Sequence, residues 1–183
     1  MIVALFSLLA AVAAVDPGPI AGAEAGEQTP SEARMDILSD ARDGLVQCYQ
    51  PQIYEKTCKI MASYSFNPDG QILSTAQMLM DETGPAVLVV TTPVAVKDGA
   101  LCGQLDALPT ARFLVAGQPA TPGQDAGYRA LLSLGPKKGE ICARWVADGH
   151  GFIVHGSLDG KPHRDFDQRM IWVYPEEGYR VAP

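Results

Sequence analysis

The stretch that decides the fold runs from residue 57 to residue 67 and reads Thr57-Cys58-Lys59-Ile60-Met61-Ala62-Ser63-Tyr64-Ser65-Phe66-Asn67. Its apolar residues recur at every second position, and this period is typical of a β-strand with one buried face. Asn67-Pro68-Asp69-Gly70 is a strong turn signal, and residues 71–81 carry a second run that can return beside the first. The stretch therefore predicts an antiparallel hairpin.

Further apolar runs follow the hairpin, and turn signals separate several of them. The runs span residues 86–92, 100–105, 112–116, 141–147, 152–158 and 168–174. Four Asp-Gly turns lie between apolar runs, namely Asp69-Gly70, Asp98-Gly99, Asp148-Gly149 and Asp159-Gly160. Such turns indicate antiparallel pairing. Pro93 lacks a backbone N–H, so the strand that contains it should form a bulge or lie at a sheet edge.

Two helices are predicted beside these strands. The first begins at Thr29-Pro30-Ser31-Glu32, which offers an N-cap, a proline at the first helical position and a capping box. Pro51 ends this helix, and its apolar residues follow one another at helical spacing, namely Ile37, Leu38, Ala41, Leu45 and Cys48. The second helix is short and covers residues 125–134.

The order helix, strands, helix, strands predicts an α+β fold. In this fold, an antiparallel β-meander is packed by one long N-terminal helix and one short middle helix. Each half of the chain has a helix, a strand with an early cysteine and an Asp-Gly turn, so two helix-plus-meander halves are an alternative arrangement. The plan resembles that of cystatin-like domains, and an architectural likeness of this kind implies no function.

The first residues of the chain indicate export. Residues 2–15 are apolar, too few to span a bilayer comfortably, and include Val12-Ala13-Ala14, which fits the small-residue rule of a signal peptidase site. We therefore expect a signal peptide over residues 1–14, a disordered linker over 15–28 and a single domain over 29–183, located in the periplasm or outside the cell. No basic segment precedes the apolar run, so an uncleaved membrane anchor is the alternative.

The cysteine count supports the same compartment. Cys48, Cys58, Cys102 and Cys142 are an even set, and an even set in an exported chain predicts two disulfides. Of the three pairings that four cysteines allow, we prefer Cys48–Cys58, which closes a short loop, and Cys102–Cys142, which joins the two halves of the chain. A zinc site is the competing interpretation, but the spacing contains no Cys-x-x-Cys pair.

Charge and motifs limit the classes of partner. The formal net charge is −7 and the basic residues form no block, so the chain should not bind nucleic acid or anionic lipid through its overall field. The sequence contains no glycine-rich phosphate-binding loop. We therefore expect no nucleic-acid partner, no cofactor, no metal, and no stable membrane insertion once the signal is removed.

An enzyme is one alternative, based on the densest polar cluster of the chain. This cluster contains three histidines and two carboxylates: His150, His155, His163, Asp165 and Asp167. A hydrolase or metal-dependent enzyme would need these groups to converge, and a Ser157–His155–Asp165 triad can be written down. However, the spacing matches no metal motif, and Ser157 lies outside a Gly-x-Ser-x-Gly elbow. We interpret these residues as turn and outer-face residues and assign no catalytic residue.

The C-terminal tail is the segment most typical of an interface. Tyrosine, tryptophan and arginine are enriched in protein interfaces, and the tail offers Trp172, Tyr174, Tyr179 and Arg180. A core strand with a buried Trp172 is the competing interpretation, which we prefer. The tail contains Ile171-Trp172-Val173 and ends in Glu177-Gly178-Tyr179-Arg180-Val181-Ala182-Pro183. On these residues it resembles exported bacterial proteins of unknown function, which implies no activity.

The sequence therefore favours a non-enzymatic binding or protein-interaction module in the cell envelope, with another envelope protein as its partner. The support is the export signal, the lack of catalytic spacing, and strand edges that could receive a partner strand. A small-molecule carrier is a further alternative, in which the sheet curves around an apolar pocket lined by Tyr64, Phe66 and Met78.

Overall fold

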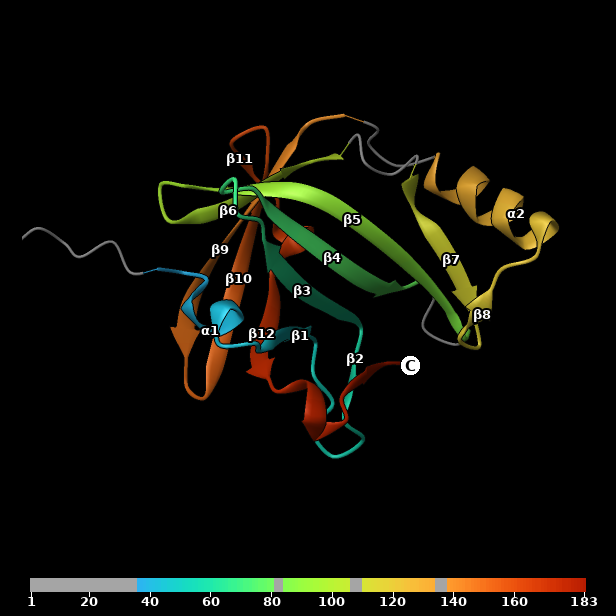
Figure 1. The fold of residues 1–183 in the computed structure, drawn as a ribbon, viewed down its shortest axis with the longest axis horizontal. Coiled ribbons are helices and arrows are strands. Elements are labelled where there is room, and N and C mark those ends of the chain that lie inside the picture. Colours follow the sequence, from blue (N-terminus) through green and yellow to red (C-terminus); the bar gives the residue numbers. More distant parts are fainter. Residues whose placement is uncertain (1–35, 81–83, 106–109, 134–137) are drawn as a thin grey trace, which may run out of the picture. The chain divides into compact units, whose positions relative to one another are not determined.

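A computed structural model of the chain describes residues 36–80, 84–105, 110–133 and 138–183 (Figure 1). These residues belong to one compact unit, Arg34–Pro183. The predicted signal peptide, the predicted linker and the start of the predicted N-terminal helix lie outside the described residues. Within the described ranges, no helix is long and apolar enough to cross a membrane.

The structure is mostly β, with 53% of the described residues in strands, and eight strands form a closed antiparallel barrel. The barrel strands are β1 (Val46–Tyr49), β3 (Ile60–Phe66), β4 (Ile72–Leu79), β5 (Ala86–Lys97), β6 (Ala100–Gln104), β9 (Glu140–Asp148), β10 (Gly151–Leu158) and β12 (Gln168–Val173). Each strand pairs with the next barrel strand along the chain, and β12 pairs with β1 to close the ring.

The predicted α+β fold is therefore wrong. The sheet buries its apolar face by curling on itself, which removes the need for a long packing helix and leaves the ring without open edges. Among the described residues, α2 (Pro122–Leu132) is the one helix of seven or more residues. The alternative of two helix-plus-meander halves is also wrong, because the strands of both halves belong to one ring.

The long N-terminal helix is replaced by one short turn of helix and a strand. Helix α1 (Ser39–Arg42) is followed by Gly44, whose φ of 89° ends it, and then by β1. Strand β1 inserts between β12 and β3, so that Gln47 pairs with Trp172 on one side and with Ala62 on the other. Backbone pairing on both sides outweighs the helical spacing of the apolar residues, since helix propensity is a weak preference.

The predicted hairpin is confirmed. Strands β3 and β4 pair from Ile60↔Met78 to Phe66↔Ile72, and the Asn67 N–H donates to the Gln71 carbonyl across the turn. Strand β5 continues through Pro93 instead of ending there. At residues 90–93, β5 pairs with β4 alone, because β7 pairs with the beginning of β5 and β6 pairs with its end. A proline is tolerated at such a local edge.

The beginning of β5 extends past β6 and carries a small helical arm (Figure 1). Strand β7 (Arg112–Val115) pairs with this part of β5, and β8 (Gln118–Pro119) pairs with β7. Helix α2 begins at a Thr121 capping box and replaces the helix predicted over residues 125–134. Its Tyr128 ring stacks on Phe113 of β7 at 5.2 Å between centroids. The arm therefore packs on the barrel through a core that it shares with Ala76, Met78 and Val90.

Both predicted disulfides are confirmed, as Cys48–Cys58 and Cys102–Cys142. Cys48 and Cys58 form a buried cluster with Val173 and Tyr179 on the outside of the barrel. There the C-terminal strand β13 (Arg180–Val181) runs parallel to β2 (Thr57–Cys58), after the 3-10 helix η3 (Pro175–Glu177). The first disulfide thus anchors the tail to the barrel wall.

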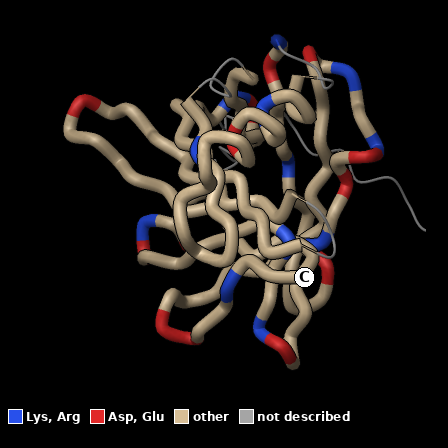
Figure 2. Tube along the Cα trace, turned by 90° about the vertical axis from the view of Figure 1, so that its right-hand side faces the viewer, with Lys and Arg blue, Asp and Glu red and all other residues tan. Residues whose placement is uncertain are grey.

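Two short elements connect β10 to β12. Strand β11 (Lys161–Pro162) pairs with the end of β10, and the 3-10 helix η2 (Arg164–Phe166) follows it. Phe166 packs so closely on Gly156 that a Cβ at position 156 would overlap it. Charged residues lie mainly in the turns and connections of the unit (Figure 2), and the described residues that line the inner cavity include none of them.

Candidate ligand cavity in the barrel

The inner face of the barrel contains a cavity with a volume of about 260 Å³. Strand register places Ala62 opposite Ala76, and Ala76 opposite Val90, so small side chains meet at the middle of β3, β4 and β5. The gap that they leave is walled mainly by aliphatic side chains, including Ile60, Met78, Val94, Leu101 and Ile141. A closed barrel of eight strands has an interior wide enough for its own side chains or for one small ligand.

One end of the barrel is filled. Leu38 has no exposed surface and packs against Leu101, Phe66 and both tryptophans of the interior, Trp145 and Trp172. Helix α1 therefore closes the end of the barrel at which β3 ends and β4 begins. The cavity lies toward the opposite end, where its wall includes Ile60, Met78 and Leu105.

A buried hydrogen-bonded cluster forms the polar part of the cavity. The Oε1 atom of Gln47, a residue with no exposed surface, accepts hydrogen bonds from the Tyr49 hydroxyl at 2.7 Å and the Tyr64 hydroxyl at 2.6 Å. Tyr49, Tyr64 and Ser74 line the cavity. Gln47 Nε2 and Trp172 Nε1 are buried without a hydrogen-bond partner among the described residues.

Burial controls the protonation of this cluster. Desolvation raises the pKa of Tyr49 and of Tyr64 well above the usual value for a phenol. The neighbouring Tyr49 raises the pKa of Tyr64 further, and a hydrogen bond with Ser74 opposes the shift only in part. Both phenols are therefore uncharged at any physiological pH.

The small-molecule carrier alternative predicted a pocket lined by Tyr64, Phe66 and Met78, and two of these three residues lie in the cavity wall. Tyr64 and Met78 line the cavity. Phe66 does not, because it packs in the Leu38 cluster at the stoppered end, where the Arg42 guanidinium stacks 4.1 Å above its ring. Sequence reasoning missed Gln47 and Tyr49, since both fall in the segment predicted to be helical, and helical spacing gave no reason to place them in a sheet interior.

The histidines and carboxylates of the enzyme alternative do not form one site among the described residues. His155 Nδ1 lies 3.2 Å from Asp167, His163 Nδ1 lies 3.8 Å from Asp165, and His150 lies in the exposed β9–β10 turn. The Ser157 hydroxyl contacts the Cys142 carbonyl at 3.5 Å and not His155. The structure therefore separates the cluster into two surface pairs and one turn residue.

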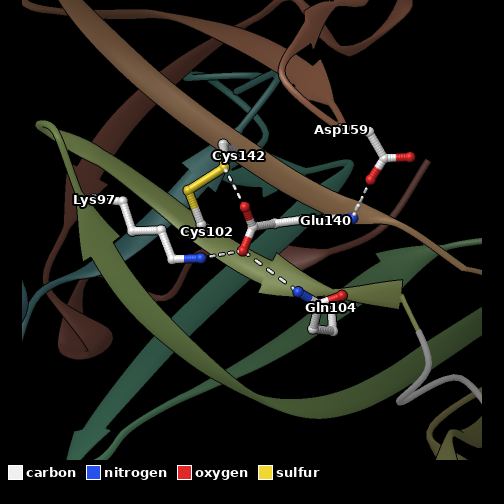
Figure 3. A network of polar contacts seen from close by, with 6 residues as sticks. All are labelled: Lys97, Cys102, Gln104, Glu140, Cys142 and Asp159. Carbon is white, nitrogen blue, oxygen red and sulfur yellow. Dashed lines mark hydrogen bonds and ion pairs between the residues drawn. A yellow bond between two sulfur atoms is a disulfide. The ribbon is translucent and has the colours of Figure 1, made fainter.

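A second hollow, of about 390 Å³, lies on the outer face over the Cys102–Cys142 disulfide. Glu140 lines this hollow, pairs with Lys97 and lies within 3.4 Å of Gln104 Nε2, while its backbone N–H donates to Asp159 (Figure 3). The Glu140 carboxylate also contacts Cys142 Sγ at 3.8 Å. This sulfur is part of a disulfide and carries no hydrogen, so the network is best explained as a brace between the β5–β6 hairpin and β9.

That network also contains the one set of three metal-ligating side chains found in the described part of the chain, namely Cys102, Glu140 and Cys142. Two of its three ligand atoms are sulfurs already bonded to each other. A disulfide sulfur is a poor ligand compared with a thiolate. The set therefore gives no support to a metal centre while the disulfide is intact.

The tail residues predicted for an interface are divided between two environments. Trp172 faces the barrel interior, with its ring 6.5 Å from Trp145 and 6.4 Å from Tyr64 between centroids. Tyr179 packs on the outer Cys48–Cys58 cluster. Tyr174 has 48% of its surface exposed, and Arg180, which follows Tyr179, is exposed as well. Trp172 is half-buried against the core, and the interaction role of the tail stays a prediction.

Comparison with known proteins adds no further assignment: no family model, no curated protein and no solved structure matches this chain. The functional interpretation therefore depends on the cavity itself.

Proposed function

We propose that this protein is a non-enzymatic binding protein that holds one small, largely apolar molecule in its barrel cavity. The observation that carries the proposal is the apolar cavity of about 260 Å³ in the interior of a closed barrel. Ligand sites are typically concave, mostly apolar and supplied with a few polar groups, and the mouths of β-barrels are among their usual places.

The small side chains of the wall support an occupant. Two larger residues in place of Ala62 and Ala76 would remove much of the space of about 260 Å³. A ligand that enters this space is favoured by the burial of its own apolar surface.

The volume also sets the size of the ligand. An apolar cavity of about 150 Å³ holds benzene. In proportion, about 260 Å³ accommodates a molecule of roughly ten non-hydrogen atoms. The ligand is therefore smaller than most drug-sized molecules and of the size of a fused bicyclic ring or a medium-chain alcohol.

We place this activity outside the cytoplasm, in the periplasm or the extracellular space. Two disulfides are compatible with an oxidising compartment, since cytosolic thiols are kept reduced. The apolar run at residues 2–15 supports the same location as an export signal.

Isothermal titration calorimetry with indene, an uncharged bicyclic hydrocarbon, tests the proposal. The wild-type protein should bind indene in one site per chain. Ala76→Leu fills the cavity and should abolish binding, whereas Gln77→Leu adds the same side chain at the adjacent, exposed position and should preserve it. Absence of binding to the wild-type protein, or equal binding to the Ala76→Leu variant, would contradict the proposal.

A further inference from the structure

The two tyrosine hydroxyls at the cavity already use their own hydrogens. The Tyr49 and Tyr64 hydroxyls both donate to Gln47 Oε1, at 2.7 Å and 2.6 Å. A phenol has one hydrogen to donate and two lone pairs that can accept. Once the hydrogen is committed to Gln47, each phenol oxygen can offer only acceptor capacity to a ligand.

The cluster as a whole therefore has an excess of acceptors. Ser74 and Thr92, which pair across β4 and β5, add two hydroxyls to the wall, each with one hydrogen and two lone pairs. Gln47 has an unpartnered Nε2 donor, but Gln47 does not belong to the cavity wall among the described residues. Unused lone pairs in a buried site are satisfied when the ligand supplies an O–H or N–H.

The cavity also lacks a charge that could neutralise an ion. None of the described side chains that form its wall is acidic, basic or histidine. Taking an ionised group out of water without a counter-charge is strongly unfavourable. A carboxylate or ammonium ligand would therefore lose more in desolvation than the phenol oxygens could return.

We infer that the cavity selects an uncharged ligand with an apolar body and a hydrogen-bond donor, an alcohol, phenol or ring N–H, directed at the oxygens of Tyr49 and Tyr64. The inference rests on the proposed function and narrows its ligand class. It assigns the tyrosine pair a specificity role, while the aliphatic wall supplies affinity for any molecule of suitable size.

Three bicyclic probes of nearly equal shape separate these contributions. Indole carries an N–H donor, benzofuran carries an oxygen acceptor without a donor, and indene carries neither. In calorimetric titrations, indole should bind the wild-type protein about 2- to 10-fold more tightly than indene or benzofuran, the usual range for one net hydrogen bond. Benzamide, which is uncharged, should likewise bind more tightly than benzoate, an anion of similar size.

Tyr64→Phe is the decisive variant because it removes one acceptor oxygen and keeps the ring. It should reduce the advantage of indole over indene toward one while leaving indene affinity within about twofold, since apolar burial is unchanged. Tyr54→Phe is the matched control, because Tyr54 is 97% exposed and lies outside the cavity wall. It should leave the preference for indole unchanged.

The outcomes distinguish this inference from the proposed function. If none of the probes binds, the proposed function fails. If indole and indene bind equally, the cavity is a binding site without donor selection, and the inference alone fails. If benzofuran binds best, the Gln47 amide has the opposite orientation and the phenol hydrogens point to the ligand, which also overturns the inference.

Discussion

The two walls of the barrel differ in how they fill its interior. Strands β3, β4 and β5 contribute small or hydroxyl-bearing residues, including Ala62, Ser74 and Ala76, and these line the cavity. Strands β9, β10 and β12 contribute large residues, among which Met170 has no exposed surface and Trp145 and Trp172 contact each other edge to face. The barrel is thus packed along one wall and hollow along the other.

This difference indicates that the two walls serve different purposes: one stabilises the fold, and the other leaves space for a ligand. The packed wall and the α1 stopper supply the buried apolar area that stabilises the fold. The hollow wall leaves space for a ligand, although its Ala62 also belongs to the buried core that contains Met170. Tyr49 and Tyr64 lie at the seam between the walls and contribute to both.

The largest expected effect concerns the covalent link between β6, which borders the hollow wall, and β9 of the packed wall. Cys102 on β6 joins Cys142 on β9 across a separation of 40 residues, so Cys102→Ser with Cys142→Ser should lower the free energy of unfolding by about 4 kcal/mol on the loop-entropy model. Cys48 and Cys58 are only 10 residues apart, and their double serine variant should lose about 3 kcal/mol. Urea unfolding under non-reducing conditions measures both, and a reversed order would contradict this account.

Shortening a buried side chain of the packed wall should strongly reduce the free energy of unfolding. Met170 is fully buried in contact with Tyr49 and Val154, so Met170→Ala should reduce the free energy of unfolding by about 3 kcal/mol through lost contacts and a new void. Chemical denaturation followed by tryptophan fluorescence measures the loss. Val96→Ala on the exposed part of β5 is the control, since its side chain is 45% exposed and should change stability by less than about 0.5 kcal/mol.

The hairpin and the disulfides could be predicted because their signals are local or nearly so. A period of two places Ile60, Ala62 and Tyr64 on one face wherever the hairpin is located in the fold. Loop length favoured Cys48–Cys58, and the remaining pair followed from it. Tyr64 and Met78 were also correctly placed at a pocket, since alternation alone predicts which side chains face a curved sheet's interior.

Closure of the ring could not be predicted in the same way. It depends on β1, whose four residues follow apolar positions spaced like those of a helix, and on pairing of β1 with β12 at the other end of the chain. Periodicity within one segment carries no information about a partner so distant in sequence. The cavity depends on the same closure, and therefore Gln47 and Tyr49 could not be assigned to it.

The two walls should also differ in their tolerance of added volume. Val154 is 2% exposed within the packed cluster, so Val154→Leu should destabilise the fold by about 1.5 kcal/mol through overpacking. Ala76→Leu extends into the cavity and should change stability by less than about 1 kcal/mol, in either direction. Thermal unfolding of the two variants compares them directly, and equal destabilisation would show that the cavity wall is as tightly packed as the other.

The smallest expected effect is a decrease in the free energy of unfolding at alkaline pH, which tests whether water is excluded from Tyr49 and Tyr64. Burial raises the pKa of Tyr49 and Tyr64, so the folded protein retains phenol protons that the unfolded chain releases above its pKa of about 10. Stability is therefore unaffected by these groups below about pH 9 and decreases as the pH rises through 10. Between pH 9 and pH 10.5 each buried tyrosine should lower the free energy of unfolding by about 0.8 kcal/mol.

Comparison of variants isolates this contribution from other groups that titrate at alkaline pH. Tyr64→Phe should lose less stability than the wild-type protein over this interval, whereas the exposed Tyr54→Phe should follow the wild-type curve. Urea midpoints measured at the two pH values give the difference. If Tyr64→Phe shows the wild-type dependence, its phenol ionises as readily in the folded state as in the unfolded chain, which would require water at the Gln47 cluster and a hydrated cavity in place of an apolar one.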